Sequence, residues 1–101
     1  MDIAEAQKLA WENKLSKGFN TTDVAMEFGL LTAEIGEAFT AWRKQLPDHG
    51  EELADVFLYL VALAQMQGVN LDQEVANKIA KNVRRTYAPG ANGALVRTGE
   101  E

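Results

Sequence analysis

Residues 51–64 read EELADVFLYLVALA, and this stretch decides the fold. From Leu53 to Ala64, apolar side chains would cover the whole circumference of a helix. A helix of that kind belongs at the centre of a helical bundle, because a surface helix needs a polar face. The stretch nevertheless begins with acidic residues, and Asp55 stands directly before the apolar run. Those acidic residues therefore need an explanation of their own.

Glycine and proline divide the chain into four segments, each with the apolar spacing of a helix. The breaks are Gly18, the PDHG segment 47–50, Gly68 and the APGANG segment 88–93. No segment of useful length alternates as a strand does. A chain of 101 residues buries a modest core by itself. We therefore predict an all-α fold, a four-helix bundle completed by oligomerisation.

The helix ends follow from capping residues. Gly18 is a natural end for a first helix over residues 2–17, because glycine adopts the left-handed conformation without strain. The second helix is expected to run to about Gln45. Side chains that accept hydrogen bonds from free backbone N–H groups mark the starts of helices. The expected starts of the last three helices are Thr21 or Thr22, Asp48 or Gly50, and Asn70.

Length and composition indicate one helical domain over residues 1–87 and a Gly-rich tail over residues 88–101, for which composition favours disorder. The absence of cysteine excludes disulfides and thiolate metal sites. A net charge of −5 argues against binding to a nucleic-acid polymer. The longest apolar run, Val56–Ala64, is too short to span a membrane, and the N-terminus has no apolar signal region. We expect a cytoplasmic protein.

Two pairs of carboxylates carry the strongest functional signal. Glu34 and Glu37 lie three residues apart, as do Glu52 and Asp55, so each pair lies on one face of its helix. The short PDHG connection predicts antiparallel packing of the second and third helices, which can bring the pairs together. Converging buried carboxylates repel one another unless a cation binds them, and all-oxygen ligation suits Mg²⁺, Mn²⁺ or Ca²⁺.

An ordinary solvated acidic face explains the spacing equally well. Two observations favour a site: apolar residues surround the first pair, and Asp55 directly precedes the apolar run Val56–Ala64. Di-iron bundles need a Glu-x-x-His motif on two helices, whereas the one histidine here, His49, falls in a turn.

Further candidates surround these pairs in the sequence. Tyr59 follows Asp55 by one turn and is either a core residue or a ligand contact. Trp42 is either core or a surface on which a base stacks. The basic run KIAKNVRR, residues 78–85, is either a solvated face or a phosphate-neutralising one, and Lys14 and Lys17 have the same two interpretations.

The chain resembles a known enzyme family. Glu34-x-x-Glu37 followed by Glu52-x-x-Asp55 matches the motif of the MazG-type all-α nucleoside triphosphate pyrophosphohydrolases. The segments ELADVFLYLVALA, GVNLDQEVANKIAKN and RRTY resemble the dCTP pyrophosphatase branch of that family. The resemblance covers about residues 5–87.

The resemblance implies hydrolysis of a nucleoside triphosphate to the monophosphate and pyrophosphate, with Mg²⁺ or alternatively Mn²⁺. It implies a house-cleaning role, with dCTP as the first expected substrate and dATP as the next. It also implies a homodimer or a dimer of dimers. The four motif carboxylates would hold the metal, and Glu34 or Glu37 would act on the attacking water. The implied substrate contacts are Tyr59, Lys78, Asn82 and Arg85, with Trp42, Phe19 and Lys17 as further candidates.

Two alternatives remain open at this point. One is a non-catalytic helical oligomerisation or interaction module in which the carboxylates hold a structural cation. The other is an enzyme similar to phosphoribosyl-ATP pyrophosphohydrolases, which share the fold. Hydrolysis of any nucleotide by the protein would exclude the non-catalytic module. Hydrolysis of phosphoribosyl-ATP but of no nucleoside triphosphate would indicate the second alternative.

Overall fold

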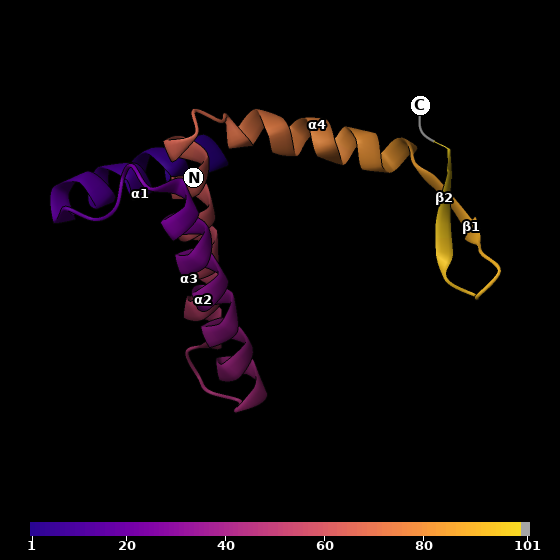
Figure 1. Ribbon diagram of the computed structural model, residues 1–101, viewed down its shortest axis with the longest axis horizontal. Helices are drawn as coiled ribbons and strands as arrows, with labels where there is room; N and C mark the ends of the chain where they lie inside the picture. The colour runs from indigo at the N-terminus through magenta and orange to yellow at the C-terminus, as the bar shows by residue number, and fades with distance from the viewer. Residues whose placement is uncertain (100–101) are drawn as a thin grey trace. The chain divides into compact units, whose positions relative to one another are not determined.

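A computed structural model describes residues 1–99, which contain four helices followed by two short strands (Figure 1). The chain divides into two compact units, Met1–Leu71 and a second that begins at Asp72. The elements are α1 (Ile3–Lys17), α2 (Val24–Arg43), α3 (His49–Met66), α4 (Leu71–Arg84), β1 (Thr86–Pro89) and β2 (Leu95–Gly99). The four helices expected from the sequence are therefore all present.

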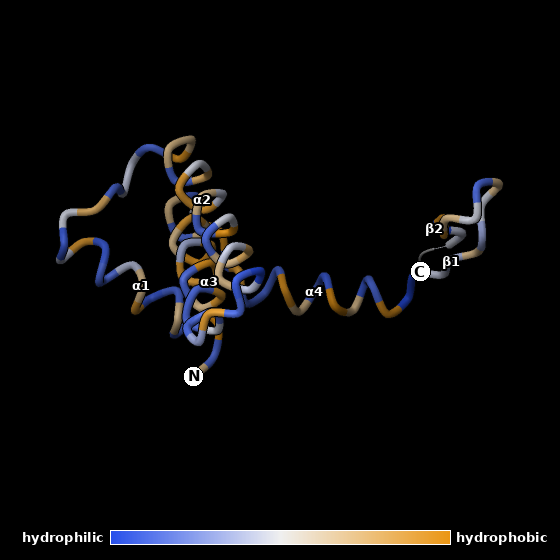
Figure 2. The backbone as a smooth tube through the Cα atoms, turned by 90° about the horizontal axis from the view of Figure 1, so that it is seen from below, coloured by the Kyte–Doolittle hydropathy of each residue, from blue (hydrophilic) through white to orange (hydrophobic). Residues whose placement is uncertain are grey.

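In the first unit, α3 is the central helix and packs against both α1 and α2. Its residues 61–64 are all buried, and the other buried apolar residues are small, Ala6 on α1 and both Ala38 and Ala41 on α2. Alanine at these positions lets the helices approach closely. Figure 2 shows apolar residues along both α2 and α3. The expectation that the apolar stretch 53–64 forms the central helix is confirmed.

Two polar ties hold α1 against the rest of this unit. The buried Gln7 side-chain amide donates to Gln65 Oε1 at 3.0 Å and to the Val69 carbonyl at 2.9 Å. Further along α1, Lys14 Nζ lies 3.0 Å from Glu27 Oε1 in a buried ion pair. Because buried polar groups are costly without partners, these contacts fix α1 at two separate points.

The start of α2 differs from the sequence prediction. Its N-cap is Asp23, whose Oδ1 accepts from the Met26 N–H at 3.0 Å, and neither Thr21 nor Thr22 is the cap. Asn20 shapes the loop before the helix, since its Oδ1 accepts from the Asp23 N–H at 3.0 Å. Because the Asn20 side chain orders this loop, the helix begins after both threonines.

The other helix ends agree more closely with expectation. Gly18 follows α1 in the left-handed conformation, with φ of 70°. Asp48 is the N-cap position of α3, so Gly50 lies inside the helix. Helix α2 ends at Arg43, two residues before Gln45, which has a positive φ of 54° in the connection to α3.

In the second unit, α4 is amphipathic and leads into an antiparallel β1–β2 hairpin that the sequence analysis did not predict. The strands are only four and five residues long, too short for a clear alternating pattern. Gly93 provides the positive φ of the turn, and the Thr86 and Thr98 hydroxyls are 2.9 Å apart across the strands. The expected disordered tail therefore contains regular structure through Gly99, and its last two residues, 100–101, lie outside the described range.

Among residues 1–99, no single helix is long and apolar enough to cross a membrane. Within the same residues, α3 and α4 taken together across the break between them reach that length and composition.

Candidate functional site

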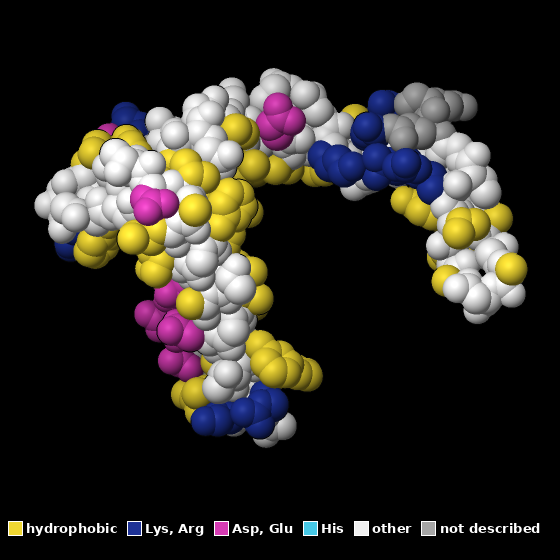
Figure 3. Space-filling model, in the orientation of Figure 1, with side chains coloured by type: hydrophobic (Ala, Val, Ile, Leu, Met, Phe, Trp, Pro, Cys, Tyr) yellow, Lys and Arg dark blue, Asp and Glu magenta, His cyan; other side chains and the backbone are white. Residues whose placement is uncertain are grey.

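Three of the four predicted carboxylates converge where α2 packs against α3. One oxygen from each of Glu34, Glu37 and Glu52 lies within 4.8 Å of the other two, and we call these three residues the carboxylate cluster. Figure 3 shows acidic side chains gathered on one face of the α2–α3 pair. The antiparallel connection through residues 44–48 brings the two helices together here. This spacing of oxygens suits a hard divalent cation, which prefers all-oxygen ligands.

The electrostatics of the cluster also suit a cation. Burial raises the pKa of Glu34, and the charges of Glu37, Asp55 and Glu52 raise it further. Burial likewise raises the pKa of Glu52, with Glu37 the largest charge contribution. The Glu52 Oε2 atom is buried and has no hydrogen-bond partner among residues 1–99. A cation would give this oxygen a partner and would relieve the repulsion between the carboxylates. The residues therefore fit the metal that the carboxylate motif implies.

Asp55, the fourth predicted ligand, lies one turn beyond Glu52 on α3 and outside the group of three. It is close enough to the cluster for its charge to raise the pKa of both Glu34 and Glu52. Asp55 also lines a cavity of about 410 Å³ between α1 and α3, which we call the α1–α3 cavity. Its walls are formed by Leu9, Ala10, Asn13, Lys14, Phe19, Glu27, Asp55, Leu58, Tyr59 and Ala62.

Two of the predicted substrate contacts, Phe19 and Tyr59, line the α1–α3 cavity. The pKa of Tyr59 is raised by burial and then by the charges of Glu34 and Glu27. Tyr59 therefore keeps its proton at neutral pH and can donate a hydrogen bond. Its position links the cavity to the carboxylate cluster. The cavity volume falls in the range of roughly 300–1,000 Å³ that is typical of small-molecule sites.

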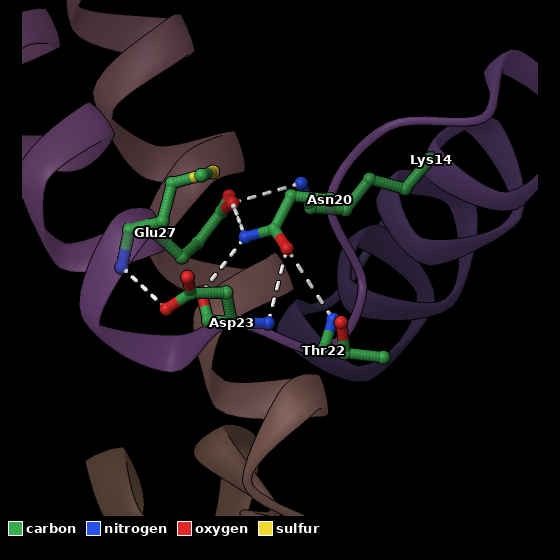
Figure 4. A network of polar contacts seen from close by, with 6 residues as sticks. Lys14, Asn20, Thr22, Asp23 and Glu27 are labelled. Carbon is green, nitrogen blue, oxygen red and sulfur yellow. Dashed lines mark hydrogen bonds and ion pairs between the residues drawn. The ribbon is translucent and has the colours of Figure 1, made fainter.

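A polar network at the wall of this cavity was missed by the sequence analysis (Figure 4). Glu27 is fully buried, with a relative exposure of 0%, and its Oε1 accepts from Lys14 Nζ at 3.0 Å and from Asn20 Nδ2 at 3.2 Å. Its Oε2 is buried, and no group in the described part of the chain donates a hydrogen bond to it. The available signal was a lone glutamate in the apolar stretch VAMEFGLL, residues 24–31. Its partners come from α1 and the following loop, which spacing along one helix does not reveal.

Trp42 and the two candidate lysines of α1, Lys14 and Lys17, are placed apart from the expected roles. Trp42 lines a different cavity, next to Pro47 and His49, and its ring centroid lies 6.0 Å from that of Phe39. Lys14 is engaged with Glu27, whereas Lys17 Nζ bonds Asn13 Oδ1 at 2.9 Å on the surface. Within this chain, the structure does not bring Trp42 or Lys17 to the α1–α3 cavity.

The remaining predicted substrate contacts belong to the second unit. Lys78 and Asn82 lie on α4, and Arg85 follows its last residue. Arg85 Nη1 donates to Asn82 Oδ1 at 3.3 Å, so these two side chains lie together.

Comparisons with known proteins agree with this geometry. The family model of the MazG nucleotide pyrophosphohydrolase domain matches residues 27–87, which include the carboxylate cluster, Asp55 and α4. The chain is also similar to a solved MazG-like pyrophosphohydrolase of cyanophage S-2L, determined with dGDP and three catalytic Mn²⁺ ions per active site. The TM-score is 0.74 at 26% identity, over 97% of this chain and 93% of that one.

No curated protein sequence matches the chain significantly. The family match spans more than half of the chain, and the structural likeness extends over nearly all of it. The family and the likeness indicate a hydrolase that acts on nucleotide anhydrides. The chain belongs to the MazG nucleotide pyrophosphohydrolase family.

Proposed function

We propose that the protein hydrolyses deoxynucleoside triphosphates to the monophosphate and pyrophosphate, with Mg²⁺ as cofactor and Mn²⁺ as an effective substitute. The observation that carries the proposal is the carboxylate cluster beside the α1–α3 cavity. The carboxylate cluster suits the cation that accompanies a triphosphate. The cavity has the size and the apolar walls that a nucleoside needs. The likeness to an enzyme solved with dGDP and Mn²⁺ supports both assignments.

Glu34, Glu37 and Glu52 would hold the metal, with Asp55 completing the set from the next turn of α3. The bound metal would neutralise phosphate charge and lower the pKa of a water molecule. The carboxylates themselves orient that water, and Glu34 or Glu37 accepts its proton. The water attacks the α-phosphorus, the bond from this phosphorus to the bridging oxygen breaks, and pyrophosphate leaves with the electron pair.

The rest of the substrate would be held by groups with matching chemistry. We assign the nucleoside to the α1–α3 cavity, where Phe19 offers an apolar ring and Tyr59 a hydroxyl donor. Lys78, Asn82 and Arg85 have the charge and hydrogen-bond donors that bind phosphate, and they stay proposed substrate contacts on that chemistry alone. We do not assign Trp42 and Lys17 to the substrate site of a single chain. Trp42 lines a different cavity, and Lys17 lies on the surface, where it donates to Asn13.

For the base, dCTP is the first proposed substrate and dATP the next, and the relative solved with dGDP adds dGTP to the panel. We further propose a house-cleaning role in the cytoplasm, in which surplus or modified deoxynucleotides are removed before a polymerase uses them. A homodimer or a dimer of dimers is the proposed assembly, supported by large apolar side chains that remain exposed on α2 and α3.

The test is incubation of the protein with each canonical dNTP and NTP, with and without Mg²⁺, with pyrophosphate and monophosphate both assayed. A Glu37→Gln variant removes one oxygen ligand of the cluster and should lose at least about 100-fold in kcat/KM, in line with removal of a group that stabilises the transition state. Glu51→Gln is the matched control, because Glu51 is exposed on the same helical turn as Glu52 and makes the same change in charge.

Mg²⁺-dependent release of pyrophosphate that Glu37→Gln loses and Glu51→Gln keeps would support the proposal. Release of inorganic phosphate would mean that a different bond is cut. A blank nucleotide panel together with consumption of phosphoribosyl-ATP would assign the second enzyme class considered for the sequence.

A further inference from the structure

The α1–α3 cavity combines apolar walls with a charge-balanced polar end. Leu9, Leu58 and Ala62 contribute aliphatic surface, and Phe19 contributes an aromatic ring. At the polar end, the positive charge of Lys14 is already paired with Glu27. A phosphate would find no available cation there and would meet the carboxylates of Glu27 and Asp55. An uncharged heterocycle is therefore the part of a nucleotide that suits this end.

Glu27 is the one fully buried acidic side chain among the described residues. Both hydrogen bonds to its carboxylate go to Oε1, from Lys14 and from Asn20. Oε2 is equally buried and accepts no hydrogen bond within the described residues. A buried acceptor without a donor costs about 1–3 kcal/mol, and more when it is charged. Glu27 lines the cavity, so a rotation of its side chain that turns Oε2 toward a hydrogen-bond donor of a bound ligand would remove that cost.

From this geometry we infer that Glu27 selects the base: its Oε2 accepts a hydrogen bond from an exocyclic amino group of a nucleobase bound in the α1–α3 cavity. The inference rests on the proposed function, because it concerns the nucleoside of the same substrate. A carboxylate oxygen only accepts hydrogen bonds, so it attracts an amino group and repels a carbonyl oxygen. Cytosine, adenine and guanine carry an exocyclic amino group, whereas uracil and thymine present carbonyl oxygens flanking one ring N–H.

The pair dCTP and dUTP isolates this contact, because the two differ at position 4 of the base, amino against oxo, and in the ring proton that accompanies the change. A buried site built for a hydrogen bond rejects an analogue that leaves it unpaired far more strongly than an apolar pocket rejects a change in size. We expect the wild-type enzyme to favour dCTP over dUTP by at least about 100-fold in kcat/KM.

The isosteric variant Glu27→Gln should reverse the preference. Lys14 Nζ and Asn20 Nδ2 are both donors, so they hold the amide oxygen of the glutamine on their side. The amide NH₂ group then replaces Oε2 and donates where the wild-type residue accepts. The ratio of kcat/KM for dCTP to that for dUTP should fall at least about 10-fold, with dUTP gaining in absolute terms. Glu12→Gln, at an exposed position of α1 outside the cavity, is the matched control and should leave the ratio unchanged.

If Glu27→Gln does not fold, the inference can still be tested on the wild-type protein with a substrate analogue. The triphosphate of 2-pyrimidinone deoxyriboside lacks any substituent at position 4, so it removes the donor without adding a carbonyl. Slower hydrolysis of this analogue than of dCTP is expected, with dUTP slower still. Equal hydrolysis of all three would overturn the role of Glu27 and leave the proposed reaction standing, whereas a panel in which no nucleotide is cleaved would overturn both.

Discussion

At the scale of single residues, the carboxylate cluster is a site where stability and function oppose each other. Glu34, Glu37 and Glu52 are held together by the packing of α2 on α3, although their charges repel. Burial and repulsion both raise the pKa of Glu34 and of Glu52. The metal-free fold therefore binds protons at these positions more tightly than the unfolded chain does, which links its stability to pH.

The sign of this linkage gives a prediction for the metal-free protein. Both glutamates have folded-state pKa values above the ordinary value of 4.5, so their contribution is fully present below pH 4.5 and is lost as pH rises through the raised values. We expect the part of the free energy of unfolding that is due to Glu52 to fall between pH 4.5 and neutrality. Urea unfolding in EDTA, with Glu52→Gln alongside, measures it. A difference between the two proteins that does not change with pH would contradict the linkage.

Metal addition should reverse this loss. With Mg²⁺ as the proposed cofactor, saturating Mg²⁺ should bind the folded state alone and raise Tm by on the order of 10 °C for a domain of this size. Glu52→Gln should lose most of that increase while the metal-free variant stays at least as stable as wild type, because one repelling charge is gone. Glu51→Gln, exposed on the adjacent position, should keep the full increase. Thermal unfolding at pH 7.5 with and without Mg²⁺ makes the comparison.

The ion pair between Lys14 and Glu27 gives a second residue-scale prediction. Lys14→Met leaves a buried carboxylate without its cation, which costs about 3–5 kcal/mol. Lys17→Met makes the same chemical change three residues further along α1, at an exposed position, and should change stability by less than about 0.5 kcal/mol. Similar denaturation midpoints for the two variants would show that the pair is not buried in solution.

At the scale of the elements, the sequence predicted the helices better than it predicted their ends. The all-round apolar pattern of residues 53–64 and the short connection after Pro47 were sufficient to predict an antiparallel α2–α3 pair. The start of α2 was wrong by one or two residues, because Asn20 orders the loop before the helix and leaves Asp23 as the cap. The strands β1 and β2 were missed because each is too short to show a pattern.

The cap of α2 can be assigned by a pair of alanine substitutions. Asp23→Ala removes the acceptor of the Met26 N–H and should destabilise the protein by about 1 kcal/mol. Thr22→Ala changes an exposed side chain and should have an effect within about 0.5 kcal/mol. Chemical denaturation of both variants gives the two values. A larger loss of stability for Thr22→Ala than for Asp23→Ala would show that the threonine is the cap.

The candidate site shows the same division between what sequence can and cannot predict. Three motif carboxylates converge as the spacing indicated, because two helices and one short connection determine their positions. The partnership of Glu27 with Lys14 and Asn20 depends on how α1 and its loop pack, and no periodicity within one helix encodes that. Trp42 had two sequence interpretations, and only the packing places it in a cavity away from Tyr59.

At the scale of the whole molecule, large apolar side chains remain on the surface of the chain. Ile35, Phe39 and Trp42 follow one another at helical spacing on α2, and each is more than half exposed. Contiguous apolar surface of this kind is typical of a protein interface. Figure 3 also shows apolar side chains at the surface of the α2–α3 pair. The stripe formed by these three residues is the surface we assign to assembly.

Light scattering after gel filtration should therefore give a mass of two or four times the 11.1 kDa chain. Phe39→Glu places a charge in the middle of the stripe and should shift the protein toward the monomer by at least about 10-fold in dissociation constant. Met26→Glu is the matched control, since Met26 is similarly exposed on α2 but faces away from the stripe. A wild-type protein that stays monomeric at high micromolar concentration would contradict the assignment of this stripe to assembly.

The two ties of α1 have a consequence for the order of folding. The α2–α3 pair closes through a short connection, whereas the bonds of Gln7 join residues separated by 58 and 62 positions. Closing the longer loop costs more chain entropy, so we expect the contacts of Gln7 to form after the pair, although Lys14 and Glu27 are only 13 positions apart. The carboxylate cluster belongs to the early pair, and the α1–α3 cavity exists only once α1 is in place. A chain caught midway would already bind a cation while still being unable to distinguish one base from another.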